Sequence, residues 1–143
     1  MQDWLKNAWL TEHQSSAQEI KGLLALVERD LHDCCASELS SDWRFNIAYN
    51  AALQSATAAL AAAGYRATRD AHHFRVIQSL SLTLGAAPGT IRQLDAFRKK
   101  RNLTSYEVGG RISDQEAKEM AALAEKLREE VQRWIKANHP SLL

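Results

Sequence analysis

The sequence predicts an all-α protein, an up-and-down bundle of four long helices with a shorter basic helix. Apolar residues recur every three or four positions through most of the chain, whereas no window alternates with a period of two. Capping residues and glycines mark the ends of these periodic segments. The 143 residues, 45% of them hydrophobic, suit one domain with a substantial core. We expect a single domain over residues 1–143, with residues 1–14 as a short amphipathic N-terminal extension.

The first two long helices are predicted over residues 15–36 and 42–63. An apolar stripe with helical spacing defines the first of them: Ile20, Leu23, Leu24, Val27, Leu31, Cys34 and Cys35. Ser40 or Ser41 is the expected N-cap of the second, and Gly64 is its expected end. The second half of that helix is rich in alanine, which favours a helix and lets neighbouring helices approach closely.

The third helix is predicted over residues 69–84, with Thr68 as its cap. His72 and His73 lie in its first turn. Two consecutive helical residues diverge by about 100°, so they do not readily bind one metal ion, and no His-Glu-x-x-His pattern accompanies them. We expect this pair to make packing or polar contacts, and we expect no metal and no cofactor.

The two remaining helices have capping boxes in the sequence. Thr90 with Gln93 fits the start of the shorter basic helix, which is expected to follow a turn at Pro88-Gly89. Ser113 with Glu116 fits the start of the last long helix.

Two arginines of the basic helix fall on its apolar stripe. Ile91, Leu94, Arg98 and Arg101 share one face. The opposite, solvent side carries Arg92, Lys99 and Lys100. A buried guanidinium needs an acceptor, which can be a carboxylate, a carbonyl group or a phosphate. Either the two arginines pair with acidic groups of the bundle, or they form a phosphate or nucleotide site.

Charge is concentrated near this helix rather than spread over the chain. The net charge of +1 gives no general argument for binding nucleic acid or membranes. Residues 88–111 carry six basic and two acidic side chains, a local charge of +4. We therefore expect any anionic partner to bind at this segment.

The remaining sequence features concern the two cysteines, the cellular location and the N-terminal segment. Cys34 and Cys35 are adjacent and do not form a disulfide framework, so we expect reduced thiols in the core. No signal peptide and no long apolar run is present, which predicts a cytoplasmic protein. Trp4 and Trp9 either dock on the bundle or form a partner-binding arm.

Several segments together resemble the HEPN superfamily, the small helical domains of prokaryotic toxin–antitoxin, defence and nucleotidyltransferase-associated systems. They are Asp42-Trp43-Arg44-Phe45-Asn46-Ile47-Ala48-Tyr49-Asn50-Ala51-Ala52-Leu53, alanine-rich sequence to Gly64-Tyr65-Arg66, His72-His73, and Phe97-Arg98-x-x-Arg101-Asn102-x-x-x-Tyr106. The resemblance covers about residues 15–137 and rests on the order and spacing of these segments. It implies a HEPN-like helical domain.

The resemblance also implies a chemistry. Active members are metal-independent ribonucleases with an Arg-Asn pair followed by a His, and two copies form one composite cleft. A 2′-hydroxyl attacks the neighbouring phosphate, the His acts as acid and base, and the Arg stabilises the developing charge. In this chain Tyr106 stands where that His would fall. The candidate catalytic residues are thus Arg101, Asn102 and Tyr106, and the candidate phosphate- or RNA-binding residues are Arg98, Lys99, Lys100 and Arg101.

Three functions remain open at this point. The first is a non-catalytic HEPN-like module, expected to be a homodimer, that binds RNA or nucleotide phosphate or serves as a partner subunit. The second is a divergent ribonuclease toxin in which Arg101 and Tyr106 suffice or a His from elsewhere serves. The third is a purely structural interaction protein with Arg98 and Arg101 in salt bridges. A nucleotidyltransferase or antitoxin is a possible partner under this resemblance, with Tyr106 as a candidate for modification.

Overall fold

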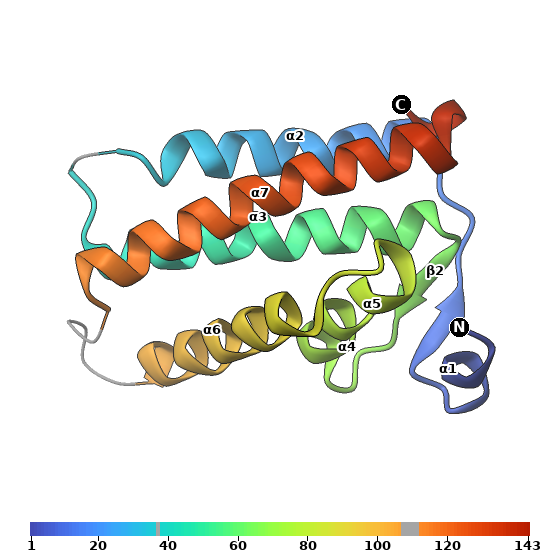
Figure 1. The fold of residues 1–143 in the computed structure, drawn as a ribbon, viewed down its shortest axis with the longest axis horizontal. Helices are drawn as coiled ribbons and strands as arrows, with labels where there is room; N and C mark the ends of the chain where they lie inside the picture. Colours follow the sequence, from blue (N-terminus) through green and yellow to red (C-terminus); the bar gives the residue numbers. More distant parts are fainter. Residues whose placement is uncertain (37, 107–111) are drawn as a thin grey trace.

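The protein is an all-α helical bundle with one small two-stranded sheet (Figure 1). The computed structural model describes residues 1–36, 38–106 and 112–143, without the side chains of residues 103–106. Its elements are α1 (Gln2–Lys6), β1 (Leu10–Glu12), α2 (Ala17–Asp33), α3 (Ser41–Ala62), β2 (Tyr65–Ala67), α4 (His72–Gln78), α5 (Leu80–Thr83), α6 (Pro88–Tyr106), α7 (Asp114–Asn138) and the 3-10 turn η1 (Pro140–Leu142).

Helix α3 lies at the centre of the bundle. It contacts α2 and α7 on one side and α4, α5 and α6 on the other (Figure 1). The α3 residues with a fully or almost fully buried side chain are mostly alanines: Ala48, Ala51, Ala52, Ala56, Ala58 and Ala59. Such short side chains let several helices approach one axis at once, as the sequence predicted. The Ser40 side chain caps α3, and Gly64 ends it with a φ of +97°.

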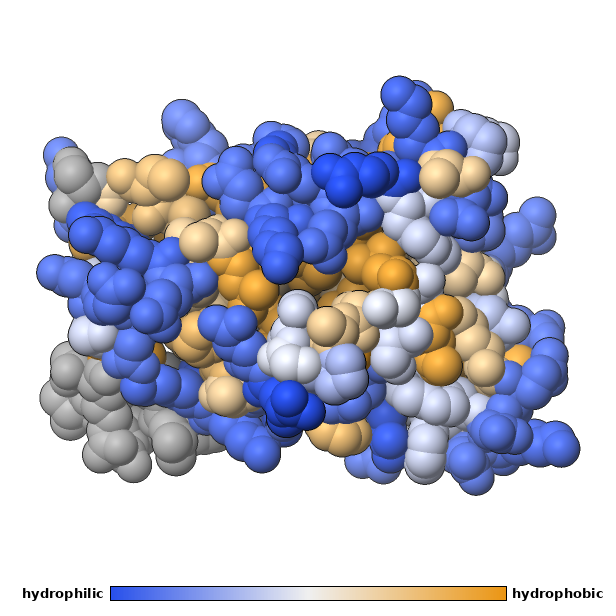
Figure 2. Space-filling model, in the orientation of Figure 1, coloured by the Kyte–Doolittle hydropathy of each residue, from blue (hydrophilic) through white to orange (hydrophobic). Residues whose placement is uncertain are grey.

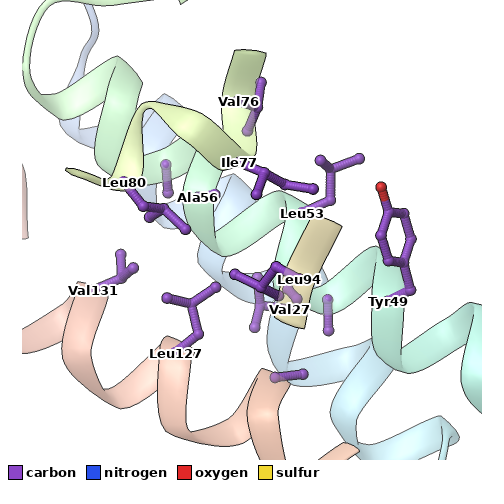
Figure 3. Packing of buried hydrophobic residues seen from close by; sticks show 14 of the residues in the cluster. Val27, Tyr49, Leu53, Ala56, Val76, Ile77, Leu80, Leu94, Leu127 and Val131 are labelled. Atoms are coloured by element: carbon purple, nitrogen blue, oxygen red, sulfur yellow. The ribbon is translucent and has the colours of Figure 1, made fainter. Parts of the chain in front are cut away.

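The hydrophobic core is built around this helix. Figure 3 shows aliphatic side chains from α4, α6 and α7 meeting residues of α3, among them Ile77, Leu94 and Leu127. Tyr49 is labelled in the same view and is 2% exposed, so it brings a phenol hydroxyl into this core.

Helix α7 confirms its predicted start and stripe. The Ser113 side chain accepts a hydrogen bond from the backbone of Glu116, whose carboxylate accepts one from the backbone of Ser113. The stripe residues Met120, Leu123, Leu127, Val131 and Ile135 are buried, and Trp134 is half-buried. On the face in Figure 2, apolar surface is visible between the polar side chains of α7 and the layer formed by α5 and α6.

The predicted third helix, residues 69–84, is wrong in its start and in its continuity. Thr68 does not cap it; its hydroxyl donates to the Trp9 carbonyl, and Ala71 precedes α4 with φ +51° and ψ +42°. The helix also breaks at Ser79, whose buried hydroxyl donates to the Val76 carbonyl. Such side-chain bonds compete with the regular helical pattern. Two short helices replace one long helix.

The basic helix is longer than predicted. It begins at Pro88, not near Ile91, so Thr90 lies inside α6 and the predicted capping box with Gln93 does not form the helix start. Proline suits a first helical turn because its missing N–H has no partner there in any case. Among the described helices, the long ones are thus α2, α3, α6 and α7.

The lack of a period-two window in the sequence predicts that the protein has no sheet, and this prediction is wrong for one short pair of strands. Strands β1 and β2 pair in antiparallel fashion, with Leu10 opposite Ala67 and Glu12 opposite Tyr65. Three residues are too few for a period-two pattern to show in the sequence. The pairing fixes the N-terminal segment against the bundle, and the Trp4 and Trp9 rings meet edge to face.

Both cysteines are free thiols, as predicted, but only Cys34 is buried. Cys34 is the C-cap of α2, and Cys35, one residue further along the chain, is exposed. Within the described parts of the chain, no helix is long and apolar enough to cross a membrane.

Candidate functional site

Three helices bring a tyrosine, a histidine and an arginine together. Tyr49 comes from α3, His73 from the first turn of α4 and Arg101 from α6. A hydrogen bond of 3.2 Å joins the Tyr49 hydroxyl and Nδ1 of His73. The guanidinium carbon of Arg101 lies 5.3 Å from the centre of the Tyr49 ring, within cation–π range. We call these three residues the Tyr49 cluster.

The surroundings keep both titratable groups of the Tyr49 cluster neutral. Burial raises the pKa of Tyr49 to about 12, although the positive charges of Arg101 and Arg98 oppose this change. Burial also lowers the pKa of His73, and the charges of Arg101, His72 and Arg98 lower it further. At neutral pH, the Tyr49 cluster therefore holds a phenol and an uncharged imidazole beside a permanent cation.

This arrangement suits the binding of an anion that lies next to a group with an exchangeable proton. A guanidinium presents planar donors that match the oxygens of a phosphate. A neutral imidazole has one nitrogen that donates and one that accepts, and its bond to the Tyr49 hydroxyl selects between the two tautomers. In the tautomer whose Nδ1–H donates to the Tyr49 oxygen, Nε2 of His73 can accept a proton from a group held near Arg101.

Arg98 lies one turn before Arg101 and has an acidic partner. Its Nε donates to Oδ1 of Asp95 at 2.7 Å, and both side chains are largely shielded from water. Asp95 also lies 3.5 Å from Nζ of Lys99. Arg98 therefore forms a salt bridge, which was one of the two expectations for it. Asp95 offsets only part of the positive charge of Arg98 and Lys99, so the α6 segment stays basic.

Lys100 does not lie on the solvent side as predicted. It forms an ion pair with Glu116 in the first turn of α7. Hydrogen bonding from Lys100 lowers the pKa of Glu116, which keeps the pair charged at neutral pH. Lys100 therefore ties α6 to α7, which makes it a weaker candidate for phosphate binding than Arg98 or Arg101.

The other predicted site residues lie toward the end of α6. Lys99 and Asn102 are exposed. Helix α6 continues past Asn102 to Tyr106. The Tyr106 side chain lies outside the described residues, so its predicted role stays a prediction.

The helical spacing predicted Arg98 and Arg101 on the face of α6 that meets the bundle, and both lie against rings of other helices, Arg98 over Phe74 of α4 and Arg101 over Tyr49 of α3. The sequence patterns did not predict that Tyr49 and His73 lie beside Arg101. Tyr49 followed the helical spacing of the core, and His73 was expected only to make packing or polar contacts. Residues 49, 73 and 101 share no local signal, so their meeting depends on how the helices pack.

Tyr49 is buried, whereas His73 and Arg101 are half-buried, so the Tyr49 cluster reaches the surface through the histidine and the arginine. A cavity of about 550 Å³ is lined by residues 12–15, 62–65 and 141–142 and shares no residue with the Tyr49 cluster. Among the described residues, no three side chains of His, Cys, Asp or Glu gather to hold a metal ion.

The fold and the Tyr49 cluster define a helical bundle with a basic, aromatic-backed surface site. No family model, no curated protein and no solved structure matches the chain.

Proposed function

We propose that the protein is a HEPN-like helical module that binds RNA through its phosphates at the Tyr49 cluster and the adjoining Arg98. The observation that carries this proposal is the position of Arg101 on the Tyr49 ring beside a neutral His73. An aromatic ring beside a guanidinium limits its motion, and the planar guanidinium matches the oxygens of a phosphate. We place the protein in a toxin–antitoxin or defence system, as a binding module or partner subunit.

RNA binding is tested by fluorescence anisotropy with a labelled single-stranded RNA. We expect Arg101→Ala to weaken binding by about tenfold, because a charge-assisted contact is lost. Arg133, an exposed arginine on α7, provides the matched control Arg133→Ala, which should bind like the wild type. Affinity should fall with increasing salt as counterions compete. Equal affinity of the two variants would contradict the proposal.

A metal-independent ribonuclease is the second candidate, and the position of His73 favours it. The hallmark His of the resembling family is absent after Asn102, whereas the Tyr49 cluster contains an imidazole from another helix. In this reading His73 takes the proton of a 2′-hydroxyl, which attacks phosphorus, and Arg101 stabilises the charge on the phosphate oxygens. The bond between phosphorus and the 5′-oxygen then breaks, the 5′-oxygen takes the proton from the His73 imidazolium, and a 2′,3′-cyclic phosphate remains.

The test is cleavage of an RNA pool in the presence of EDTA. His73→Gln should abolish cleavage, whereas His72→Gln is the matched control at the neighbouring position. Binding without cleavage by the wild type would leave the non-catalytic module as the function. Cleavage that survives in His73→Gln would exclude His73 as the base.

We propose further that the module is a homodimer. Two basic α6 segments facing each other repel unless an anion lies between them. Association should therefore tighten with phosphate, sulfate or RNA, as measured by sedimentation velocity. A monomer at about tens of micromolar that does not respond to these anions would contradict the dimer.

A further inference from the structure

A second arginine with an aromatic support lies next to the Tyr49 cluster. The guanidinium carbon of Arg75, on α4, lies 3.9 Å from the centre of a Trp9 ring and 5.4 Å from the Phe74 ring. The guanidinium carbon of Arg98 lies 5.5 Å from the same Phe74 ring. Phe74 thus stands between two arginines, one from α4 and one from α6.

Trp9 is held firmly in place under Arg75. Its carbonyl accepts hydrogen bonds from the backbone N–H of Thr68 at 3.1 Å and from the Thr68 hydroxyl at 3.3 Å. The Trp4 ring packs against it edge to face, with ring centres 5.5 Å apart. The N-terminal segment therefore provides a fixed platform for the Arg75 side chain.

Arg75 differs from Arg98 in its charge balance. Arg98 has Asp95 as a partner, whereas none of the described carboxylates lies within ion-pair distance of Arg75. Arg75, Phe74 and Trp9 are each only half-buried. Stacking covers one face of the Arg75 guanidinium and leaves its N–H donors directed outward in their plane. A fixed and unbalanced guanidinium of this kind is suited to bind a phosphate.

We infer that Arg75 forms a second phosphate-binding position, and that the ligand is a single strand of RNA rather than a mononucleotide. This inference rests on the proposed function of the Tyr49 cluster. Arg101 and Arg98 lie one turn apart on α6, and Arg98 and Arg75 flank Phe74. The basic groups thus continue from α6 across α4 to the N-terminal segment. Successive phosphates of one strand can occupy such a path, whereas a mononucleotide reaches only one end of it.

The experiment measures binding of a labelled single-stranded oligouridylate of about ten nucleotides over a range of salt concentrations. Arg75→Gln should weaken binding by about tenfold and lower the slope of log affinity against log salt by about 0.7, the value for one lost contact to a single strand. Arg75→Lys keeps the charge but loses the planar stack, so its affinity should lie between those of Arg75→Gln and the wild type. Uridine monophosphate should compete poorly.

Arg133→Gln on α7 is the matched control and should leave both affinity and salt slope unchanged. Circular dichroism of every variant establishes that the fold is intact. If Arg75→Gln binds with wild-type affinity and slope while Arg101→Ala is weakened, Arg75 only packs the N-terminal segment and the inference is overturned. If Arg75→Gln is weakened while Arg101→Ala is not, the proposed function of the Tyr49 cluster fails and the Arg75 position stands. If the wild type binds no RNA, both are overturned.

Discussion

Removal of one hydroxyl tests the geometry of the Tyr49 cluster directly. Tyr49→Phe keeps the ring on which Arg101 lies and deletes only the group that bonds to Nδ1 of His73. Tyr49 is 2% exposed, so water cannot replace the lost partner easily. A hydrogen bond of this kind contributes about 1 kcal/mol to the free energy of unfolding. For a chain of this size, that corresponds to a fall of about 3 °C in the melting temperature.

The assay is urea unfolding followed by circular dichroism, arranged as a double-mutant cycle. The single variants Tyr49→Phe and His73→Leu and the double variant give a coupling free energy, which should be about 1 kcal/mol. Tyr65→Phe is the control, because the Tyr65 hydroxyl has no hydrogen bond within the described structure. It should change stability by less than about 0.5 kcal/mol.

Two results would refute this reasoning. A coupling free energy near zero would show that Tyr49 and His73 do not bond to each other. If Tyr49→Phe lowers the free energy of unfolding no more than Tyr65→Phe does, the Tyr49 hydroxyl gains nothing from His73 that water does not also supply.

Three further predictions follow from the same structure. Because the folded protein lowers the pKa of His73, stability should fall as pH drops through the unfolded value of about 6.5, and urea unfolding of His73→Gln should show a smaller fall. Ala71→Gly should raise the free energy of unfolding by up to about 1 kcal/mol, because Ala71 has a left-handed backbone conformation that glycine adopts without strain. A lower melting temperature for this variant would contradict the prediction. Ser113→Ala should cost about 1 kcal/mol through loss of the α7 cap, and an unchanged melting temperature would show that the Glu116 half of the capping box suffices.

The parts of the fold that local sequence determines were predictable. Helix α7 begins at a capping box and carries a regular stripe, and the start and end of α3 follow from Ser40 and Gly64. These signals lie within one or two turns of the feature that they specify. The same reasoning placed Arg98 and Arg101 on one face of α6, because helical periodicity alone determines that relation.

The parts that depend on distant contacts were not predictable. Strand β2 exists only because β1 pairs with it, and Thr68 bonds to Trp9 instead of capping a helix. The break at Ser79 reflects a buried side-chain bond that sequence spacing does not reveal. The Tyr49 cluster belongs to the same class, since three helices must pack before its members meet.

The pairing of β1 with β2 has a consequence for synthesis of the chain. Leu10 finds its partner only when Ala67 has been made, and Trp9 finds Arg75 later still. At usual translation rates, about 55 residues take roughly 3–11 s. During that interval the ribosome-bound chain displays two tryptophans with no bundle to receive them. Trp9 and Leu10 therefore stay without their partners until β2 and α4 have been made, and a nascent-chain chaperone has its best opportunity to bind there during that interval.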